Sequence, residues 1–328
     1  MDKQSKWISD QPENLPDFII GGAMKSGTTS LHAILDSHPD ISIQRDELGF
    51  FDIDSIIQHP DFNIYNETNS EWISQSMETD ADSLWNWYHA KFSELRTEGN
   101  LKGEDSTSYL ASSMAAKRIA MQDKPIKMIF ILRHPTQRTV SNYLHKLKSG
   151  RAIYSLEDTL RYEPWSILDR SLYKEQLEQY YKYLPFDRIK VVLFEDFIKD
   201  KRACIKSICE FLNIDFNSLD ASVFETHSNK TRIPKYVGLQ RKRNRWLRRM
   251  GDYRYPNVLP VKPTKRLKVP FWMRIIDRMH KMINPQKPSY TYKPKMETLK
   301  FLDSYFKSQL KGIDDVVQKD IYLKWFKD

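Results

Sequence analysis

The chain has 328 residues, of which 40% are hydrophobic and 29% charged, and its formal net charge is +9. This balance fits a globular protein with a sizeable core, and the positive charge favours anionic ligands. No apolar run reaches the roughly 20 residues that a membrane-spanning helix needs. The first 16 residues also lack the apolar core of a signal peptide. We therefore expect a cytoplasmic protein without a membrane span.

Two cysteines, Cys204 and Cys209, fall in one predicted helix. Five positions apart, they point in different directions, so we expect no disulfide, which suits a reducing compartment. No cysteine and histidine cluster has the spacing of a metal site, so the sequence predicts no metal.

The first predicted strand runs into a glycine turn, in residues 17–31, DFIIGGAMKSGTTSL. An apolar run is followed by two glycines, and Thr28 and Thr29 are placed to cap a helix. Backbone N–H groups, the helix dipole and the charge of Lys25 together favour a phosphate-like ligand. The alternative is a plain glycine turn with a solvated lysine.

The position of the lysine distinguishes this loop from a Walker A loop. In G-x-x-x-x-G-K-[ST], lysine follows the second glycine. Gly22 and Gly27 have this spacing, but Thr28 stands at the lysine position and Lys25 lies inside the loop. An ordinary NTPase or kinase loop therefore fits poorly.

Further along the chain, apolar runs predict strands at 41–43, 101–105, 126–132 and 189–194. Helical spacing follows several of them, and residues 53–98 are also expected to be helical. Strands that alternate with helices predict a parallel sheet with helices on both faces. We expect one domain over 1–328, with a flexible segment at 1–16 and a basic, aromatic insertion or lid at 237–292. Of the other predicted helices, one ends near residue 122 and another begins at residue 135. Four more span 172–183, 198–212, 274–283 and 296–310.

A second anion motif lies in residues 131–145, ILRHPTQRTVSNYLH. The strand carries Arg133 to the carboxyl edge of the sheet, where open α/β folds bind ligands. Helical spacing then places Arg138, Ser141 and His145 on one face. An arginine fork and a serine hydroxyl suit a terminal phosphate monoester. The alternative is an arginine–carboxylate pair that caps the sheet.

The two motifs together resemble the sulfotransferases that use 3′-phosphoadenosine 5′-phosphosulfate (PAPS) and release 3′-phosphoadenosine 5′-phosphate (PAP). The Lys25 loop resembles their 5′-phosphosulfate loop, and Arg133 with Ser141 resembles their 3′-phosphate motif. The chain is most similar to the heparan-sulfate 3-O-sulfotransferase type and to bacterial sulfotransferase domains. Further similar segments are RDELGFFD at 45–52, GEDSTSYL at 103–110, 170–197, NKTRIP at 229–234 and 293–306.

This resemblance implies a P-loop-like α/β sandwich of three layers, with a central five-stranded parallel sheet flanked by helices. It also implies PAPS as the sulfuryl donor, with no metal required. The residues that it assigns to the donor are Lys25, Ser26, Gly27, Thr28, Thr29, Ser30, Arg133, Ser141, Asn229, Lys230, Thr231 and Arg232.

The resemblance assigns the chemistry to two residues. Glu47 takes the position of the family's catalytic glutamate, so we expect it to act as general base. Lys25 is expected to stabilise the leaving phosphate. His134 and His145 are rival candidates for the base, and a solvated loop carboxylate is the alternative for Glu47.

The acceptor side departs from the family pattern, because Asp46 and Asp105 stand where many relatives have lysine. Two aspartates would repel an anionic glycan and suit a neutral or cationic acceptor. We expect a hydroxyl or amine of a small-molecule natural product or a carbohydrate, and a monomer or weak dimer. The residues expected to contact the acceptor are Asp46, Phe50, Asp105, Ser106 and His145.

The basic segment at 241–249, RKRNRWLRR, has three interpretations: a solvated helix face, a wall or lid over the site, or a nucleic-acid or membrane-surface patch. Its one tryptophan provides no stacking platform, so no nucleic acid is expected. Two other functions remain open at this point. One is a nucleotide-dependent kinase or NTPase, and the other is a basic, non-enzymatic binding module.

Overall fold

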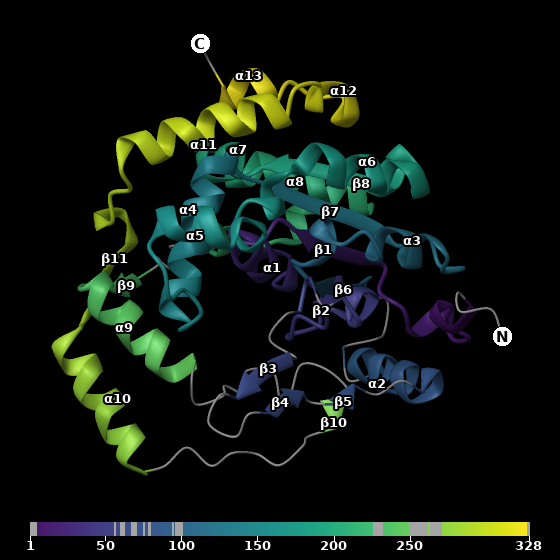
Figure 1. Cartoon of the computed structure of the whole chain (residues 1–328). Helices are drawn as coiled ribbons and strands as arrows, with labels where there is room; N and C mark the ends of the chain where they lie inside the picture. The colour runs from purple at the N-terminus through teal and green to yellow at the C-terminus, as the bar shows by residue number, and fades with distance from the viewer. Residues whose placement is uncertain are drawn as a thin grey trace.

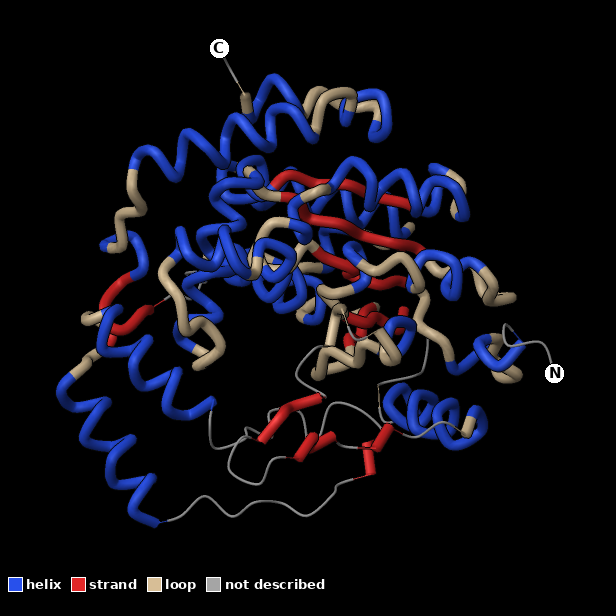
Figure 2. The backbone as a smooth tube through the Cα atoms, in the orientation of Figure 1, coloured by secondary structure: helices blue, strands red, loops and turns tan. Residues whose placement is uncertain are grey.

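The computed structural model describes residues 5–55, 57–59, 63–66, 71–74, 76–77, 80–93, 95, 101–225, 232–248, 261–262 and 271–326. Within these residues, five parallel strands form the central sheet in the order β2-β6-β1-β7-β8 (Figures 1 and 2). This confirms the predicted sheet. Its strands are β1 (Phe18–Gly22), β2 (Ile41–Ile43), β6 (Leu101–Asp105), β7 (Lys127–Leu132) and β8 (Ile189–Leu193).

Helices cover both faces of this sheet, so the described part of the chain has three layers (Figure 1). The helices of the described residues, of which some lie beside the sheet, are α1 (Thr28–Asp36), α2 (Ala81–Ser93), α3 (Ala115–Ala120), α4 (Pro135–Lys148), α5 (Leu156–Tyr162), α6 (Tyr173–Tyr183), α7 (Phe194–Lys199), α8 (Lys201–Leu212), α9 (Val237–Arg248), α10 (Phe271–Ile283), α11 (Met296–Gln309), α12 (Ile313–Val317) and α13 (Tyr322–Trp325).

Short antiparallel pairs lie outside the central sheet. They are β3 (Asn63–Asn66) with β4 (Glu71–Ser74), β5 (Ser76–Met77) with β10 (Val261–Lys262), and β9 (Arg232–Pro234) with β11 (Gln286–Pro288).

Successive side chains of a strand point to opposite faces of the sheet, so the core is divided between these two faces. Ile19, Met128 and Phe130 pack with the side chains of α3, α6 and α11 on one face. Their neighbours, among them Ile20 and Ile129, pack with α1 and α8 on the other. Buried runs such as MIFIL at 128–132 are therefore apolar throughout, as expected for parallel strands that are covered on both sides.

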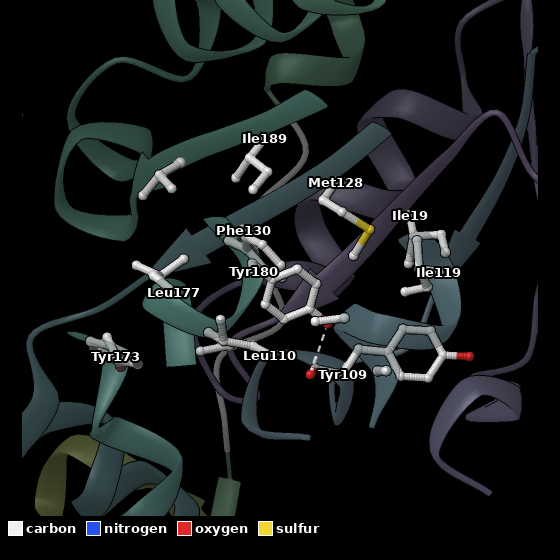
Figure 3. Close-up of a cluster of buried hydrophobic side chains, with 14 of the residues drawn as sticks. Ile19, Tyr109, Leu110, Ile119, Met128, Phe130, Tyr173, Leu177, Tyr180 and Ile189 are labelled. Carbon is white, nitrogen blue, oxygen red and sulfur yellow. Dashed lines mark hydrogen bonds between the residues drawn. The ribbon is translucent and has the colours of Figure 1, made fainter. Parts of the chain in front are cut away.

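Tyr180 of α6 joins the first of these core clusters to the loop after β6 (Figure 3). Its ring packs edge-on against Phe130, with ring centres 4.7 Å apart, and its hydroxyl donates to the carbonyl of Tyr109 at 2.9 Å. The cluster thereby fixes the backbone that follows a strand end, where ligand sites of this architecture lie.

Four sequence predictions are corrected here. Residues 5–16 are packed, because Trp7 and Leu15 are buried in the core. The helix predicted at 198–212 is two helices, since Asp200 caps α8 through the N–H of Ala203. The 53–98 stretch contains β3, β4 and β5 before α2. Gly27, in the left-handed conformation, takes the N-cap position of α1 that was assigned to the threonines.

The basic segment forms most of α9, and Asn244 attaches this helix to the end of α4. Its side-chain amide donates to the carbonyls of Leu147 and Ala152 at 3.0 and 2.8 Å. Residue 249 lies outside the described residues.

Candidate active site

The five parallel strands end at one edge of the sheet, and each delivers a candidate residue there. Lys25 follows β1, Glu47 follows β2, Asp105 ends β6, Arg133 follows β7 and Phe194 follows β8. Because carboxyl ends of parallel strands meet at the same edge, residues far apart in sequence come together.

The loop between β1 and α1 has the backbone of an anion cradle. Gly27 (φ 96°) and Lys25 (φ 69°) both adopt the left-handed conformation. A Cβ on Gly27 would lie only 2.8 Å from Cδ2 of Phe194, so the position needs glycine. The buried Ser26 hydroxyl has no hydrogen-bond partner among the described residues. This unpartnered hydroxyl, beside the free N–H groups of a helix start, fits a phosphate group.

Lys25 points toward α4, where its Nζ lies 3.3 Å from Nδ1 of His145. Burial, more than any neighbour, lowers the pKa of Lys25, while the charge of Glu47 partly offsets the effect. Burial and then the Lys25 charge lower the pKa of His145 to about 4. His145 is therefore neutral at pH 7, and its Nδ1 accepts a hydrogen bond from the ammonium group.

Arg133 connects the two predicted anion motifs. Its Nη1 donates to the carbonyl of Lys25 at 3.4 Å, and its guanidinium carbon lies 4.8 Å from the centre of the Phe194 ring. Its Nε is buried without a partner in the described part of the chain. Burial lowers the pKa of Arg133, and the charge of Glu195 opposes this shift. Ser141 is half-buried two turns along α4.

Glu47 receives a hydrogen bond from the Thr107 hydroxyl at 2.9 Å. Its side chain keeps solvent-accessible surface, yet the protein packed around the carboxyl raises its pKa. The like charge of Asp105 raises this pKa further, whereas the Thr107 hydrogen bond and the Lys25 charge lower it. Glu47 is thus a carboxylate with raised basicity near the loop lysine.

Asp105 is buried, and its Oδ2 lies 3.4 Å from Nδ1 of His32 on α1. Burial raises its pKa, and the hydrogen bond and charge of His32 oppose the shift. The second carboxyl oxygen, Oδ1, has no partner among the residues described. The carboxylates of Glu47 and Asp105 therefore lie on one side of β1, at the ends of β2 and β6, whereas Arg133 lies on the other side, at the end of β7.

A buried network below these carboxylates holds the loops in place. Glu104 accepts hydrogen bonds from the hydroxyls of Tyr88, Ser106 and Tyr109 at 2.5 to 2.6 Å. Burial raises its pKa to about 7, although these hydrogen bonds lower it. The Ser106 hydroxyl also accepts from the N–H of Gly49 at 2.9 Å, which ties the loop after β6 to the loop after β2.

This network corrects two predicted acceptor contacts. Ser106 is buried and committed to Glu104 and Gly49, so its role is structural. Phe50 is fully buried and stacks on Tyr88, with ring centres 4.2 Å apart. It belongs to the core rather than to an acceptor surface.

Two further residues of the 131–145 segment also face the protein. Arg138 is fully buried and donates to Ser171 and to the carbonyl of Ile167, so it does not share the surface of Ser141. His134 lies with Nε2 3.1 Å from the carbonyl of Trp325. Its contact with the C-terminal segment disfavours it as a base.

The remaining predicted residues are placed as follows. Thr28 is buried, Thr29 is exposed and Ser30 is half-buried at the start of α1, while Asp46 is exposed. Arg232 is exposed on β9, and Asn229, Lys230 and Thr231 lie outside the described residues.

Sequence reasoning missed Thr107, His32, Phe194 and Lys148. Thr107 bonds Glu47, His32 bonds Asp105, and Phe194 packs between Gly27 and Arg133. The charge of Lys148 lowers the pKa of Lys25, so it adds to the positive side. Thr107 and Phe194 carried a sequence signal, because they lie in the similar segments 103–110 and 170–197.

None of the helices in the described part of the chain is long and apolar enough to cross a membrane. Within the same residues, no group of three or more histidine, cysteine, aspartate or glutamate side chains is arranged to hold a metal ion.

Comparison with known proteins agrees with the geometry. A heparan sulfate glucosamine 3-O-sulfotransferase 5 of Mus musculus is 25% identical over 224 residues, which cover 65% of this chain and 57% of the relative. The membrane-associated sulfotransferase kil1 of Dictyostelium discoideum is 29% identical over 176 residues, which cover 50% of this chain and 32% of the relative. The chain thus spans less than two thirds of the length of these curated relatives.

Among solved structures, a sulfotransferase from Alicyclobacillus acidocaldarius has the same fold, with a TM-score of 0.59 at 21% identity. The match covers 95% of this chain and 98% of that one. The model of the sulfotransferase family matches residues 16–218, which is more than half of the chain. The chain therefore belongs to the sulfotransferase family.

Proposed function

We propose that this protein transfers a sulfuryl group from PAPS to a hydroxyl or amine of a small molecule or carbohydrate. The observation that carries the proposal is the hydrogen bond from Arg133 to the Lys25 carbonyl. It joins two anion motifs, 108 residues apart in sequence, at one edge of the sheet. A donor with separate 5′ and 3′ phosphate groups needs such a pair of sites.

Lys25, Ser26, Arg133 and Ser141 are the residues that would hold the donor. When bound, PAPS supplies an activated sulfuryl group. Lys25 carries the charge that neutralises the leaving phosphate, and His145 holds its ammonium group in place. Ser26 contributes an unpartnered hydroxyl, and Arg133 an unpartnered Nε. Each of the two phosphate groups would thus face a cationic side chain and a hydroxyl of the protein, so the proposal requires no metal.

Glu47 is the proposed general base. Its raised pKa makes it more basic than an ordinary carboxylate. Thr107 orients the carboxylate, and the charge interaction with Lys25 links the base to the leaving-group side. His145 is a poorer base, because its Nδ1 already accepts from Lys25 and its pKa lies near 4.

The charge around Glu47 supports an acceptor that is neutral or cationic. Asp105 is buried beside it with one carboxyl oxygen unpartnered, and Asp46 is exposed next to it in sequence. An amine or an uncharged sugar hydroxyl can approach these carboxylates, whereas a polysulfated chain would be repelled.

PAP binding tests the proposal. We expect PAP, without added metal, to stabilise the folded protein by about 2.7 kcal/mol at a concentration one hundred times its Kd. Thermal unfolding followed with increasing PAP measures this gain. A shift with ATP and magnesium, but none with PAP, would contradict the proposed donor.

A further inference from the structure

Helix α10 turns its polar side toward the protein. Asp277 accepts a hydrogen bond from Arg243 of α9 at 2.7 Å, and Nε2 of His280 lies 3.0 Å from Oε1 of Gln240, also on α9. Figure 1 shows α10 beside α9 at the margin of the molecule, away from the central sheet. An amphipathic helix usually buries its apolar side, so the orientation of α10 is reversed.

The apolar side of α10 is exposed to solvent. Phe271 and Met282, at its two ends, are each 76% exposed, and Met279 between them is 55% exposed. With Ile275 between Phe271 and Met279, spacings of three and four residues put these side chains on one side of the helix. Contiguous exposed apolar surface of this kind marks a binding site. The residues of this apolar face are Phe271, Trp272, Ile275, Met279, Met282 and Ile283.

Positive charge lies beside this apolar face. The sequences of α9 and α10 hold eight arginines and lysines against one acidic residue, Asp277, which is engaged by Arg243 and Lys281. On α10 itself, Arg274, Arg278 and Lys281 are all exposed. The partner of this surface must therefore be apolar in part and anionic in part.

We infer that α10 docks the protein on an anionic lipid surface. The apolar face enters the boundary between headgroups and acyl chains, and the exposed Arg274 and Arg278 bind lipid phosphates. Pairing of two copies through this face is disfavoured, because it would bring the two basic helix pairs together. Binding of this type is peripheral and needs no membrane-spanning helix.

Co-sedimentation of the full chain with vesicles tests the inference. The protein should bind phosphatidylcholine vesicles that contain phosphatidylglycerol, bind pure phosphatidylcholine much less, and be released by salt. The double variant Ile275→Glu, Met279→Glu should lose at least about tenfold in vesicle affinity. Arg278→Gln should lose about fivefold.

Ile198→Glu is the matched control, because Ile198 is an exposed apolar residue, 58% accessible, on α7. It should bind vesicles like the parent, and all variants should unfold at the parental temperature because the changed positions are exposed. Equal vesicle binding by the double variant and the parent would overturn the inference. So would equal binding to neutral and anionic vesicles. A parent dimer that ignores vesicles and dissociates in the double variant would reassign the face to contact between copies.

Discussion

The two sides of the candidate site differ in charge and in how their charges are held. On the donor side, Lys25 and Arg133 lie in a loop and at a strand end, partly buried and supported by α4 and Phe194. On the acceptor side, the charge of Asp105 adds to burial in raising the pKa of Glu47, and burial raises the pKa of Asp105. One sheet edge is thus divided into a cationic half, which we propose holds the leaving phosphate, and an anionic half, which we propose takes up the acceptor proton.

Lys25 and Glu47 mark the boundary between these halves. The charge of Glu47 raises the pKa of Lys25, and the charge of Lys25 lowers that of Glu47. Each group therefore favours the ionised form of the other, which is the form that the proposed reaction needs. Variants that remove one group at a time should separate turnover from nucleotide binding.

The largest expected effect belongs to Glu47→Gln, which keeps the size of the side chain but cannot accept a proton. Turnover should fall by about 10²–10⁴ for a hydroxyl acceptor, while PAP affinity stays near the parental value. Steady-state kinetics and a PAP titration on the same preparation check this. Near-parental turnover, together with an inactive His145→Ala that still binds PAP, would move the base to the histidine.

Lys25→Met should come next, because it removes the charge that faces the leaving phosphate. We expect a loss in kcat of about 10²–10³, of the size seen when one donor to a developing charge is removed. Unlike Glu47→Gln, this variant should also weaken PAP. Measuring kcat and PAP affinity for both variants distinguishes the role of Lys25 from that of Glu47. An unchanged kcat in Lys25→Met would show that Lys25 takes no part in the chemical step.

Arg133→Ala should act on binding more than on chemistry. Loss of a charged hydrogen-bonding group typically costs about 1.5–3 kcal/mol in affinity. The loss should be largest for nucleotides with a 3′-phosphate, so adenosine 5′-phosphate serves as the control ligand. Equal weakening of PAP and adenosine 5′-phosphate would show that Arg133 supports the loop without reading the 3′-phosphate.

The smallest effect concerns pH. Glu47 must be deprotonated to act as base, so turnover should fall as the pH drops through its raised pKa. Asp105→Asn removes a negative neighbour, which favours the ionised form of Glu47 and lowers its pKa. The acid limb of the kcat profile should therefore move to lower pH in this variant. An acid limb that stays at the same pH, or moves to higher pH, would show that Asp105 does not raise the pKa of the base.

The donor half was predictable because its signals are local. A buried apolar run, two glycines and an internal lysine define the loop within residues 17–31, and Arg133 directly follows the strongest strand. The acceptor half depends on contacts between distant segments. Phe50 is enclosed by Trp7 and Trp85, and Ser106 is drawn inward by Glu104. No spacing within one segment reveals such partners.

Arg138 shows that helical spacing, too, does not reveal the partners of a side chain. Its spacing from Ser141 and His145 predicted a shared face, but the length of its side chain lets it reach Ser171 and the Ile167 carbonyl inside the protein. The segment before β1 is similar, since the burial of Trp7 depends on Phe50 and on Arg118, whose guanidinium carbon lies 3.6 Å from the Trp7 ring centre. Periodicity predicts the elements, whereas side-chain partners fix which groups remain available.

The most direct test of the central claim is a calorimetric titration of PAP, without metal, into the parent, Glu47→Gln and Arg133→Ala. We predict that the parent and Glu47→Gln bind with similar affinity and that Arg133→Ala binds at least about tenfold more weakly. No PAP binding by the folded parent, or equal binding by all three proteins, would contradict it.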